Sequence, residues 1–390
     1  MKTGFANILE QLEGRSRAKL ESKLPSWAGV DIDIPSSINF QQCSGEEAAK
    51  YKASLLPSGC RVADLTGGLG ADSWAMSQRA SEVWYNERDS VLLGAVQRNF
   101  KALGVENVEF HGFDISAGAS DWLESLHTFG PDVVYLDPAR RNSAGRKVFL
   151  LEECSPDVLT LMPQLLTLCP EVMVKVSPMA DLTMLRRRLE PYLCEIHVVG
   201  SGGECKELLC ICRRDGVFKN VILAEDGFVF SPPQPDLPLE TVAASGRVNG
   251  RGPQAKRSGR DEAKRKFRGA GPAEAEEDKA SLLFVPSAAM TKSGLGPGMC
   301  RMEYDEGLSH FGKFYEVLEN LPFSSSVIKE LGRRYPKADV TARGVPISSE
   351  ELRTRLKAAP GGSVHIFACQ VDAERRLLVC QKVTLPEQGI

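Results

Sequence analysis

Short apolar runs with strand character alternate with longer helical runs between Cys60 and Arg214. The strand-like runs are Arg61–Leu65, Glu82–Asn86, Val108–Phe113, Asp132–Leu136, Val172–Val176, Cys194–Val199 and Leu208–Cys212. In one helical run, Ser90–Leu103, the large apolar residues recur on one face. Strand–helix–strand units repeated in this way predict an α/β domain, a parallel sheet with helices on both faces.

The last two of these strands are joined only by the turn Ser201-Gly202-Gly203. A parallel connection needs about a dozen residues or more, and this turn is too short for one. We therefore expect a Rossmann-like sheet of seven strands whose last strand is antiparallel.

The sequence divides into five predicted segments. Residues 1–43 form an N-terminal helical segment, and 44–231 the α/β domain, which opens with a Ser44/Glu47 capping box and a helix reaching Leu56. Residues 232–280 are a flexible, charged linker. Two small α+β units follow at 281–325 and 326–390. Nine basic and two acidic residues lie between 247 and 268, which indicates either a solvated linker or an arm that touches phosphates.

Composition restricts the function classes. The 390 residues have 48 Lys and Arg against 51 Asp and Glu, which excludes a uniformly basic nucleic-acid coat but allows local basic patches. No run approaches the ~18–20 apolar residues of a membrane span, and the N-terminus lacks the apolar core of a secretion signal. The 11 cysteines include no Cys-x-x-Cys pair, and most lie in apolar strand runs. We expect a cytoplasmic protein without membrane segment, metal site or disulfides.

The strongest chemical signal is the run Val62-Ala63-Asp64-Leu65-Thr66-Gly67-Gly68-Leu69-Gly70, which follows a predicted strand and opens a helix. Glycines let the backbone approach a nucleotide closely, and a helix N-terminus offers free N–H donors. The Gly-x-Gly-x-x-Gly spacing of dehydrogenases fails, because Ser73 occupies its third position and Asp64 precedes the loop. A nicotinamide enzyme is therefore a distant alternative.

This loop resembles the first motif of class I S-adenosylmethionine-dependent methyltransferases, an acid followed by small residues at steps of two. The resemblance implies S-adenosyl-L-methionine as cofactor, held by Asp64, Thr66, Gly67, Gly68 and Gly70. It also implies that Glu87, which ends the second strand, accepts both ribose hydroxyls, and that Asp114, which ends the third, meets the adenine amino group. Taken singly, each of these two acids could instead solvate a strand end.

A second motif, Asp137-Pro138-Ala139-Arg140-Arg141, ends the fourth predicted strand. Ligands bind at this edge of open α/β sheets. The motif resembles the Asp/Asn-Pro-Pro-aromatic motif of methyltransferases that act on base nitrogens, in which the acid and the following carbonyl accept hydrogens from the target amine. Asp137 and Pro138 are therefore the catalytic candidates. Ala139 replaces the second Pro and Arg140 replaces the aromatic residue; Arg140 and Arg141 can stack on bases and pair with phosphate.

Two more residues are candidates for the same pocket. Lys175 ends the fifth predicted strand, where an unpaired charge is costly, so we expect it to meet substrate or a site carboxylate. Methylation of a carbon would require a cysteine nucleophile. Cys154 is the candidate for that role, although a plain thiol before a helix is the favoured interpretation.

As a whole the chain resembles a class I methyltransferase family with a THUMP-like C-terminal domain, typified by Bacteroidetes proteins. The resemblance is carried by Ser44–Lys52, by the two motifs above, and by Glu204–Leu209, Pro286–Ala289, Arg343–Pro346 and Ser349–Leu352. It implies a ferredoxin-like unit at 281–325 and a THUMP-like unit at 326–390. Eight basic residues face four acids between 326 and 357. Among them Arg333, Arg334 and Arg343 are candidates for RNA contact, with Tyr335 and Phe367 as candidate exposed aromatics.

The sequence therefore predicts a methyltransferase that acts on an RNA base in tRNA or rRNA, with a base nitrogen as the favoured atom and the C-terminal units docking the RNA. Two alternatives stay open. The substrate could be a protein or a small molecule, or the chain could be a non-catalytic RNA-binding protein with a vestigial methyltransferase fold.

Overall fold

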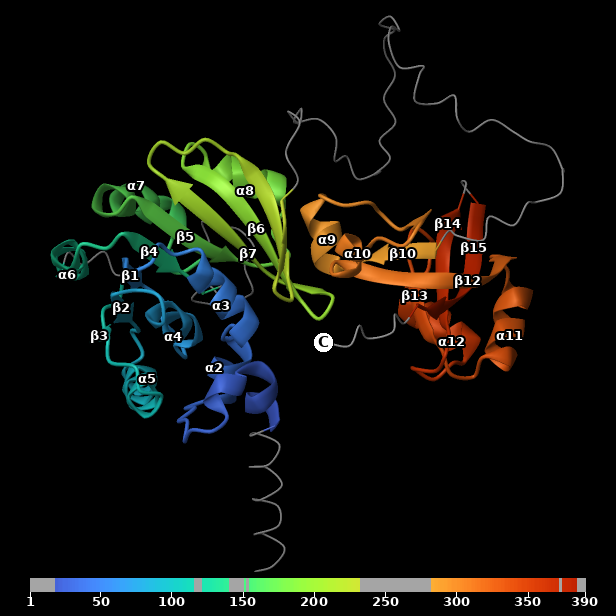
Figure 1. Cartoon of the computed structure of the whole chain (residues 1–390), viewed down its shortest axis with the longest axis horizontal. Coiled ribbons are helices and arrows are strands. Elements are labelled where there is room, and N and C mark those ends of the chain that lie inside the picture. The colour runs from blue at the N-terminus through green and yellow to red at the C-terminus, as the bar shows by residue number, and fades with distance from the viewer. Residues whose placement is uncertain are drawn as a thin grey trace, which may run out of the picture.

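The computed structural model describes residues 18–115, 121–139, 151, 154–231, 282–371 and 374–383. The predicted linker at 232–280 with its basic stretch, and Arg140 and Arg141, lie outside these residues. Figure 1 shows a larger sheet with its helices, formed by the N-terminal part of the chain, beside a smaller sheet formed by the C-terminal part. The described chain enters the larger part through a helical turn at 18–23, η1 (Pro25–Trp27), α2 (Ser37–Gln42) and α3 (Glu46–Ser54).

The larger sheet contains the seven predicted strands in the order β3-β2-β1-β4-β5-β7-β6. Neighbours among β1 to β5 pair in parallel, and β7 is antiparallel to β5 and β6, so the predicted antiparallel last strand is confirmed. A hairpin, β8 and β9, extends the sheet beyond β6 to nine strands. The strands are β1 (Arg61–Asp64), β2 (Glu82–Asn86), β3 (Val108–His111), β4 (Val133–Leu136), β5 (Glu171–Val176), β6 (Leu193–Ser201), β7 (Glu204–Arg213), β8 (Asn220–Glu225) and β9 (Phe228–Phe230).

Helices cover both faces of this sheet, because its strands alternate apolar side chains between two cores. Val62 and Tyr135 pack into one core, with α3, α4 (Ala71–Ser77) and α5 (Ser90–Ala102). Ala63 and Leu136 pack into the other, with α6 (Asp121–Phe129), α7 (Val158–Leu168) and α8 (Leu182–Leu189). A strand buried on both faces needs apolar residues at every position, which is why these runs are continuous. None of the helices in the described ranges combines the length and hydropathy needed to cross a bilayer.

The smaller sheet has the order β11-β10-β12-β15-β14-β13. Its elements are β10 (Leu282–Pro286), α9 (Ala288–Ser293), β11 (Cys300–Met302), α10 (Glu306–Ser309), β12 (Gly312–Pro322), α11 (Ser325–Arg334), β13 (Asp339–Ala342), α12 (Ser349–Leu356), β14 (His365–Val371) and β15 (Glu374–Lys382). The boundary predicted between 325 and 326 falls just after β12, which pairs with β10 on one side and β15 on the other. The two predicted C-terminal units thus share one sheet, and their division into separate domains stays a prediction.

The two sheets meet at α9, which lies against β6, β7 and β8 (Figure 1). Met290 of α9 and Phe284 of β10 belong to the same buried core as the face of the larger sheet that packs on α6, α7 and α8. The approach is close, because a Cβ added to Gly200 of β6 would lie 2.6 Å from the Cβ of Ala289. The Ser287 hydroxyl also donates to Oε2 of Glu225, at 2.5 Å. The C-terminal sheet is therefore packed into the larger part of the molecule instead of being tethered to it.

Candidate functional site

A cleft of about 760 Å³ opens where β1 to β5 end. Its volume is in the range of small-molecule sites, about 300–1,000 Å³. It is lined by every residue predicted to bind the cofactor and by both catalytic candidates: Asp64, Thr66, Gly67, Gly68, Gly70, Glu87, Asp114, Asp137 and Pro138. The predicted N-terminal segment supplies further lining through Asn39, Gln42 and Cys43, a contribution that the sequence did not reveal.

The glycine loop turns sharply between β1 and α4. Gly68 and Gly70 have φ angles of 57° and 85°, and Gly70 is the N-cap of α4. Gly67 lies against the buried ring of Tyr85, so closely that an added Cβ would be 2.0 Å from its Cε2 atom. The Tyr85 hydroxyl donates to the Gly68 carbonyl at 2.5 Å. Backbone conformation and space both require glycines here, as a close backbone approach to a ligand does.

The ends of β1, β2 and β3 are tied together by Asn86, whose amide donates to the carbonyls of Leu65 and Phe113 at 3.1 Å each. The next residue, Glu87, accepts the Gly68 N–H at 3.0 Å and the Asp89 N–H at 2.8 Å, one on each carboxylate oxygen. Each oxygen has a second lone pair. The Glu87 carboxylate is therefore fixed in direction and can still accept two hydroxyl groups.

Asp64 and Asp114 differ in environment. Asp64 is 1% exposed and accepts the Ser73 hydroxyl at 2.5 Å and the Thr66 N–H at 3.0 Å. Burial outweighs these hydrogen bonds and raises the pKa of Asp64 to about 7. Asp114 is exposed at the rim, where its carboxylate lies 3.9 Å from the Arg88 guanidinium.

Asp137 is joined to the glycine loop and to the fifth strand. Its N–H donates to Oγ1 of Thr66 at 2.6 Å, which connects the two motifs directly. Its Oδ2 lies 2.7 Å from Nζ of Lys175, so Lys175 meets a site carboxylate. Burial alone would lower the pKa of Lys175, but the carboxylates of Asp137, Glu207 and Asp72 outweigh burial and hold this pKa well above its ordinary value.

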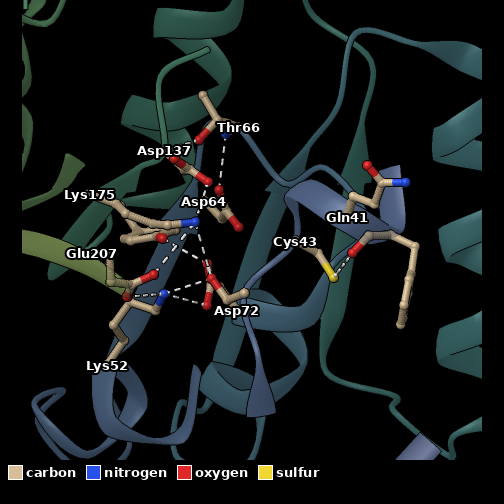
Figure 2. A network of polar contacts seen from close by, with 12 residues as sticks. Gln41, Cys43, Lys52, Asp64, Thr66, Asp72, Asp137, Lys175 and Glu207 are labelled. Atoms are coloured by element: carbon tan, nitrogen blue, oxygen red, sulfur yellow. Dashed lines mark hydrogen bonds and ion pairs between the residues drawn. The ribbon is translucent and has the colours of Figure 1, made fainter. Parts of the chain in front are cut away.

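Behind Asp137 the structure shows a buried charge network that the sequence did not predict as a unit (Figure 2). Lys52 of α3 is fully buried; its Nζ lies 2.6 Å from Oε1 of Glu207 and 2.9 Å from Oδ1 of Asp72. Lys175 lies 3.7 Å from the other Glu207 oxygen. Attraction to Lys52 and Lys175 overcomes burial and keeps the pKa of Asp72 below its ordinary value.

The predicted Ser44/Glu47 capping box is wrong. The N-cap of α3 is Gly45, with no side-chain cap, and α3 spans Glu46–Ser54. The Ser44 hydroxyl instead donates to Asp72 at 2.9 Å and accepts from Lys52 at 2.8 Å and Lys175 at 3.2 Å. Buried ammonium groups require acceptors, and Ser44 supplies one to each lysine.

A small cavity of about 20 Å³, enough for one water, adjoins the cleft beside Asp137. Lys175, Glu207 and Cys154 line it. Cys154 thus lies near the catalytic candidate, although nothing in the sequence around it marks a nucleophile.

The predicted RNA-contact residues lie apart from the cleft, on or near α11 and β13 at the far end of the smaller sheet (Figure 1). Arg333 is exposed, and Arg343 is half-buried. Arg334 makes a two-pronged ion pair with Glu319, at 2.9 and 2.6 Å, so its charge is partly neutralised within the domain. The expectation that Phe367 is exposed is wrong: it is 1% exposed, because β14 is a central strand with both faces covered.

Comparison with known proteins agrees with these observations. A family model described as THUMP domain-like matches residues 312–382. The crystal structure of a proposed methyltransferase from Porphyromonas gingivalis W83 aligns with 94% of this chain and 88% of that one, at 28% sequence identity and a TM-score of 0.69. A stretch of 110 residues, 26% of this chain, is 34% identical to the 23S rRNA (uracil(1939)-C(5))-methyltransferase RlmD of Alkalilimnicola ehrlichii. The match spans 24% of the length of that enzyme.

The chain thus has a class I methyltransferase fold with a cleft at the carboxyl edge of the sheet. It carries a THUMP-like domain at its C-terminal end, as the resemblance in the sequence predicted.

Proposed function

We propose that this protein is an S-adenosylmethionine-dependent methyltransferase that modifies a base nitrogen in tRNA or rRNA. The observation that carries the proposal is that a single cleft contains the glycine loop, the oriented Glu87 carboxylate and the Asp137-Pro138 pair. The THUMP-like domain and the rRNA methyltransferase relative favour RNA as the substrate.

The cleft fits the cofactor on three counts. Its volume suits a ligand of nucleoside size. The glycine loop, with positive φ at Gly68 and Gly70, lines the cleft and leads into the N-terminus of α4, and Glu87 keeps two acceptor sites for a pair of ribose hydroxyls. Asp64 and the loop would hold the methionine part, and Asp114 the adenine end. The bound cofactor would supply an electrophilic methyl group on a sulfonium.

Asp137 is the group available to the target nitrogen. Its side chain is 31% exposed, and it reaches the cleft while one oxygen stays with Lys175. When the nitrogen forms its bond to the methyl carbon, the sulfur keeps the electron pair of the broken S–C bond and one N–H proton has to leave. Asp137 would accept that hydrogen and release the proton to solvent through the cleft. Positioning of the target nitrogen in line with the S–C bond would then account for most of the rate enhancement.

The test combines cofactor binding with transfer. Purified wild-type protein should show a thermal shift with S-adenosylmethionine and with its demethylated product, and should transfer labelled methyl groups to tRNA or rRNA from cells that lack the protein. Asp137→Ala should bind the cofactor and lose transfer, while Asp215→Ala, an exposed acid at the opposite edge of the sheet, should behave as wild type. No labelling of RNA by the wild-type protein would refute the proposal.

Methylation of a pyrimidine carbon is the second candidate. Cys154 lines the small cavity beside Asp137, and the relative named above acts on uracil C5. RNA that contains 5-fluorouridine would then become covalently trapped on the wild-type protein and not on Cys154→Ser. If Cys154→Ser retains full transfer, the carbon mechanism is excluded.

The docking role of the C-terminal domain is best tested by charge reversal. Deletion of 326–390 would remove three strands from a six-stranded sheet and damage the fold. Arg333→Glu with Arg343→Glu should raise the KM for RNA and leave cofactor affinity unchanged. Unchanged RNA kinetics would favour a protein or small-molecule substrate.

A further inference from the structure

The charge network behind the cleft contains one carboxylate more than it has cations. Lys52 and Lys175 face Asp72, Glu207 and Asp137, and all five are joined by ion-pair distances of 2.6 to 3.7 Å. Four of these side chains are less than a tenth exposed, whereas Asp137 is 31% exposed. Among these five side chains, Asp137 is therefore the one through which the formal excess of one negative charge is exposed to solvent.

We propose that Lys175, Glu207 and Lys52 are positioning residues that hold the Asp137 carboxylate in place and keep it directed at the target N–H. This inference rests on the proposed function and adds a role for three residues that need not touch substrate or cofactor. Lys175 acts directly on Asp137, Glu207 holds Lys175, and Lys52 holds Glu207.

The geometry favours this role over a purely structural one. The network draws its members from α3, α4, β4, β5 and β7, and each ammonium has more than one anionic or hydroxyl partner. Burying charges is costly, and apolar residues of similar size often stabilise a fold at least as well. A chain of charges that ends on the one exposed carboxylate of the group is instead suited to fix the direction of that carboxylate.

The network also accounts for the position of the Asp137 carboxylate, one oxygen of which pairs with Lys175. Oδ2 of Asp137 lies 2.7 Å from Nζ of Lys175, and the Asp137 N–H donates to the Thr66 hydroxyl. Both the side chain and the backbone of Asp137 are therefore held in place. The titratable groups around Asp137 are Asp64 (β1), Asp72 (α4), Tyr135 (β4), Lys175 (β5), Glu207 (β7) and Lys52 (α3), with Cys154 and Lys206 around the small cavity. Among the described residues, Lys175 is the cation in direct contact with Asp137.

The experiment compares Lys175→Met and Lys175→Arg with Lys101→Met, which removes an exposed lysine of α5 outside the cleft. Lys175→Met should lower kcat by about 100-fold, the effect of a misplaced reacting group, with unchanged cofactor Kd and RNA KM. A loss confined to kcat separates positioning of the reacting group from loss of binding or of the fold. Lys175→Arg should restore most of the wild-type kcat, and Glu207→Gln should lower kcat by an intermediate factor.

A readout without RNA separates this inference from the proposed function. The carboxyl ¹³C chemical shift of Asp137 should differ between Lys175→Met and the wild type, because the variant lacks the ammonium group at 2.7 Å, with the cofactor thermal shift of both as a check of folding. If wild-type protein labels no RNA but this resonance moves, only the proposed function fails. If transfer is intact and Lys175→Met changes neither kcat nor the resonance, the positioning role is refuted.

Discussion

The packing of Gly67 against Tyr85 makes Gly67→Ala a sharp test of the cofactor loop. The added methyl carbon would lie 2.0 Å from Cε2, 2.4 Å from Cζ and 2.6 Å from Cδ2 of the Tyr85 ring. The ring is fully buried, its hydroxyl donates to the Gly68 carbonyl, and Phe100 and Phe110 pack against it with centroids 6.1 and 5.5 Å away. The methyl group can be accommodated only if ring or loop moves.

The structure allows the cost to be worked out. Overpacking of this kind costs about 1–3 kcal/mol. Loss of the Tyr85–Gly68 hydrogen bond adds about 1 kcal/mol, giving about 2–4 kcal/mol in all. A displaced loop also moves the Gly68 N–H that Glu87 accepts, so cofactor affinity should fall as well.

Urea unfolding with and without S-adenosylmethionine measures both effects. Gly94→Ala is the matched control, since Gly94 lies within α5 with only the flexible Arg98 side chain near the added carbon. It should stabilise the protein by about 0.5–1 kcal/mol, because alanine is the better helix former. The double variant Gly67→Ala/Tyr85→Leu should lose less stability than the sum of its single changes. A Gly67→Ala protein with wild-type stability and cofactor affinity would refute this account of the loop.

Three further predictions follow from other parts of the molecule. Burial raises the pKa of Asp64 to about 7 from its ordinary 3.8, so the folded protein holds a proton that the unfolded chain has lost, and stability should fall as pH rises between these values. Since a sulfonium favours the ionised carboxylate, cofactor affinity should rise with pH toward 7, by up to about tenfold per unit; calorimetry from pH 5.5 to 7.5 should show this in the wild type and a flat profile in Asp64→Asn. Lys52→Met removes one of the two cations that face the buried Asp72 and Glu207 carboxylates and should destabilise the protein by about 3–5 kcal/mol in urea unfolding; a loss below 1 kcal/mol would contradict the burial of Lys52 in this network. Met290→Ala should cost about 2–5 kcal/mol within a single cooperative transition, because α9 shares the core of the larger sheet; two separate transitions in the wild type would disprove that shared core.

Local patterns were sufficient to predict the strands and the cleft. The apolar runs that become β1 to β5 are continuous because both faces are buried, and the residues at their ends reach one edge by the geometry of parallel strands. The short turn at 201–203 was enough to predict that β7 runs antiparallel to β6. These features depend on neighbours within a few residues or on a general rule of sheet topology.

The charge network depends on pairings that no local pattern encodes. Lys52 and Glu207 are 155 positions apart, and Ser44 and Lys175 are 131 apart. The available signal was weak: isolated charged residues, Lys52 and Glu207, beside runs that are otherwise buried. Ser44 shows the same limit, since its spacing to Glu47 predicts a cap and only the folded structure brings Asp72 and the lysines to its hydroxyl.

The N-terminal segment is part of the architecture of the cleft. It lines the cleft through α2, and just after it Ser44 and Lys52 complete the charge network behind Asp137. A core that excluded α3 would leave Glu207 and Asp72 buried without Lys52, a state in which buried carboxylates tend to protonate. Asp137 would then lose the ordered partners that hold Lys175 in place. Leu24 and Trp27 of the segment share a buried core with Val62 of β1, so the segment and the α/β domain should fold as one unit, and the Asp137 carboxylate should acquire its direction only when that unit is complete.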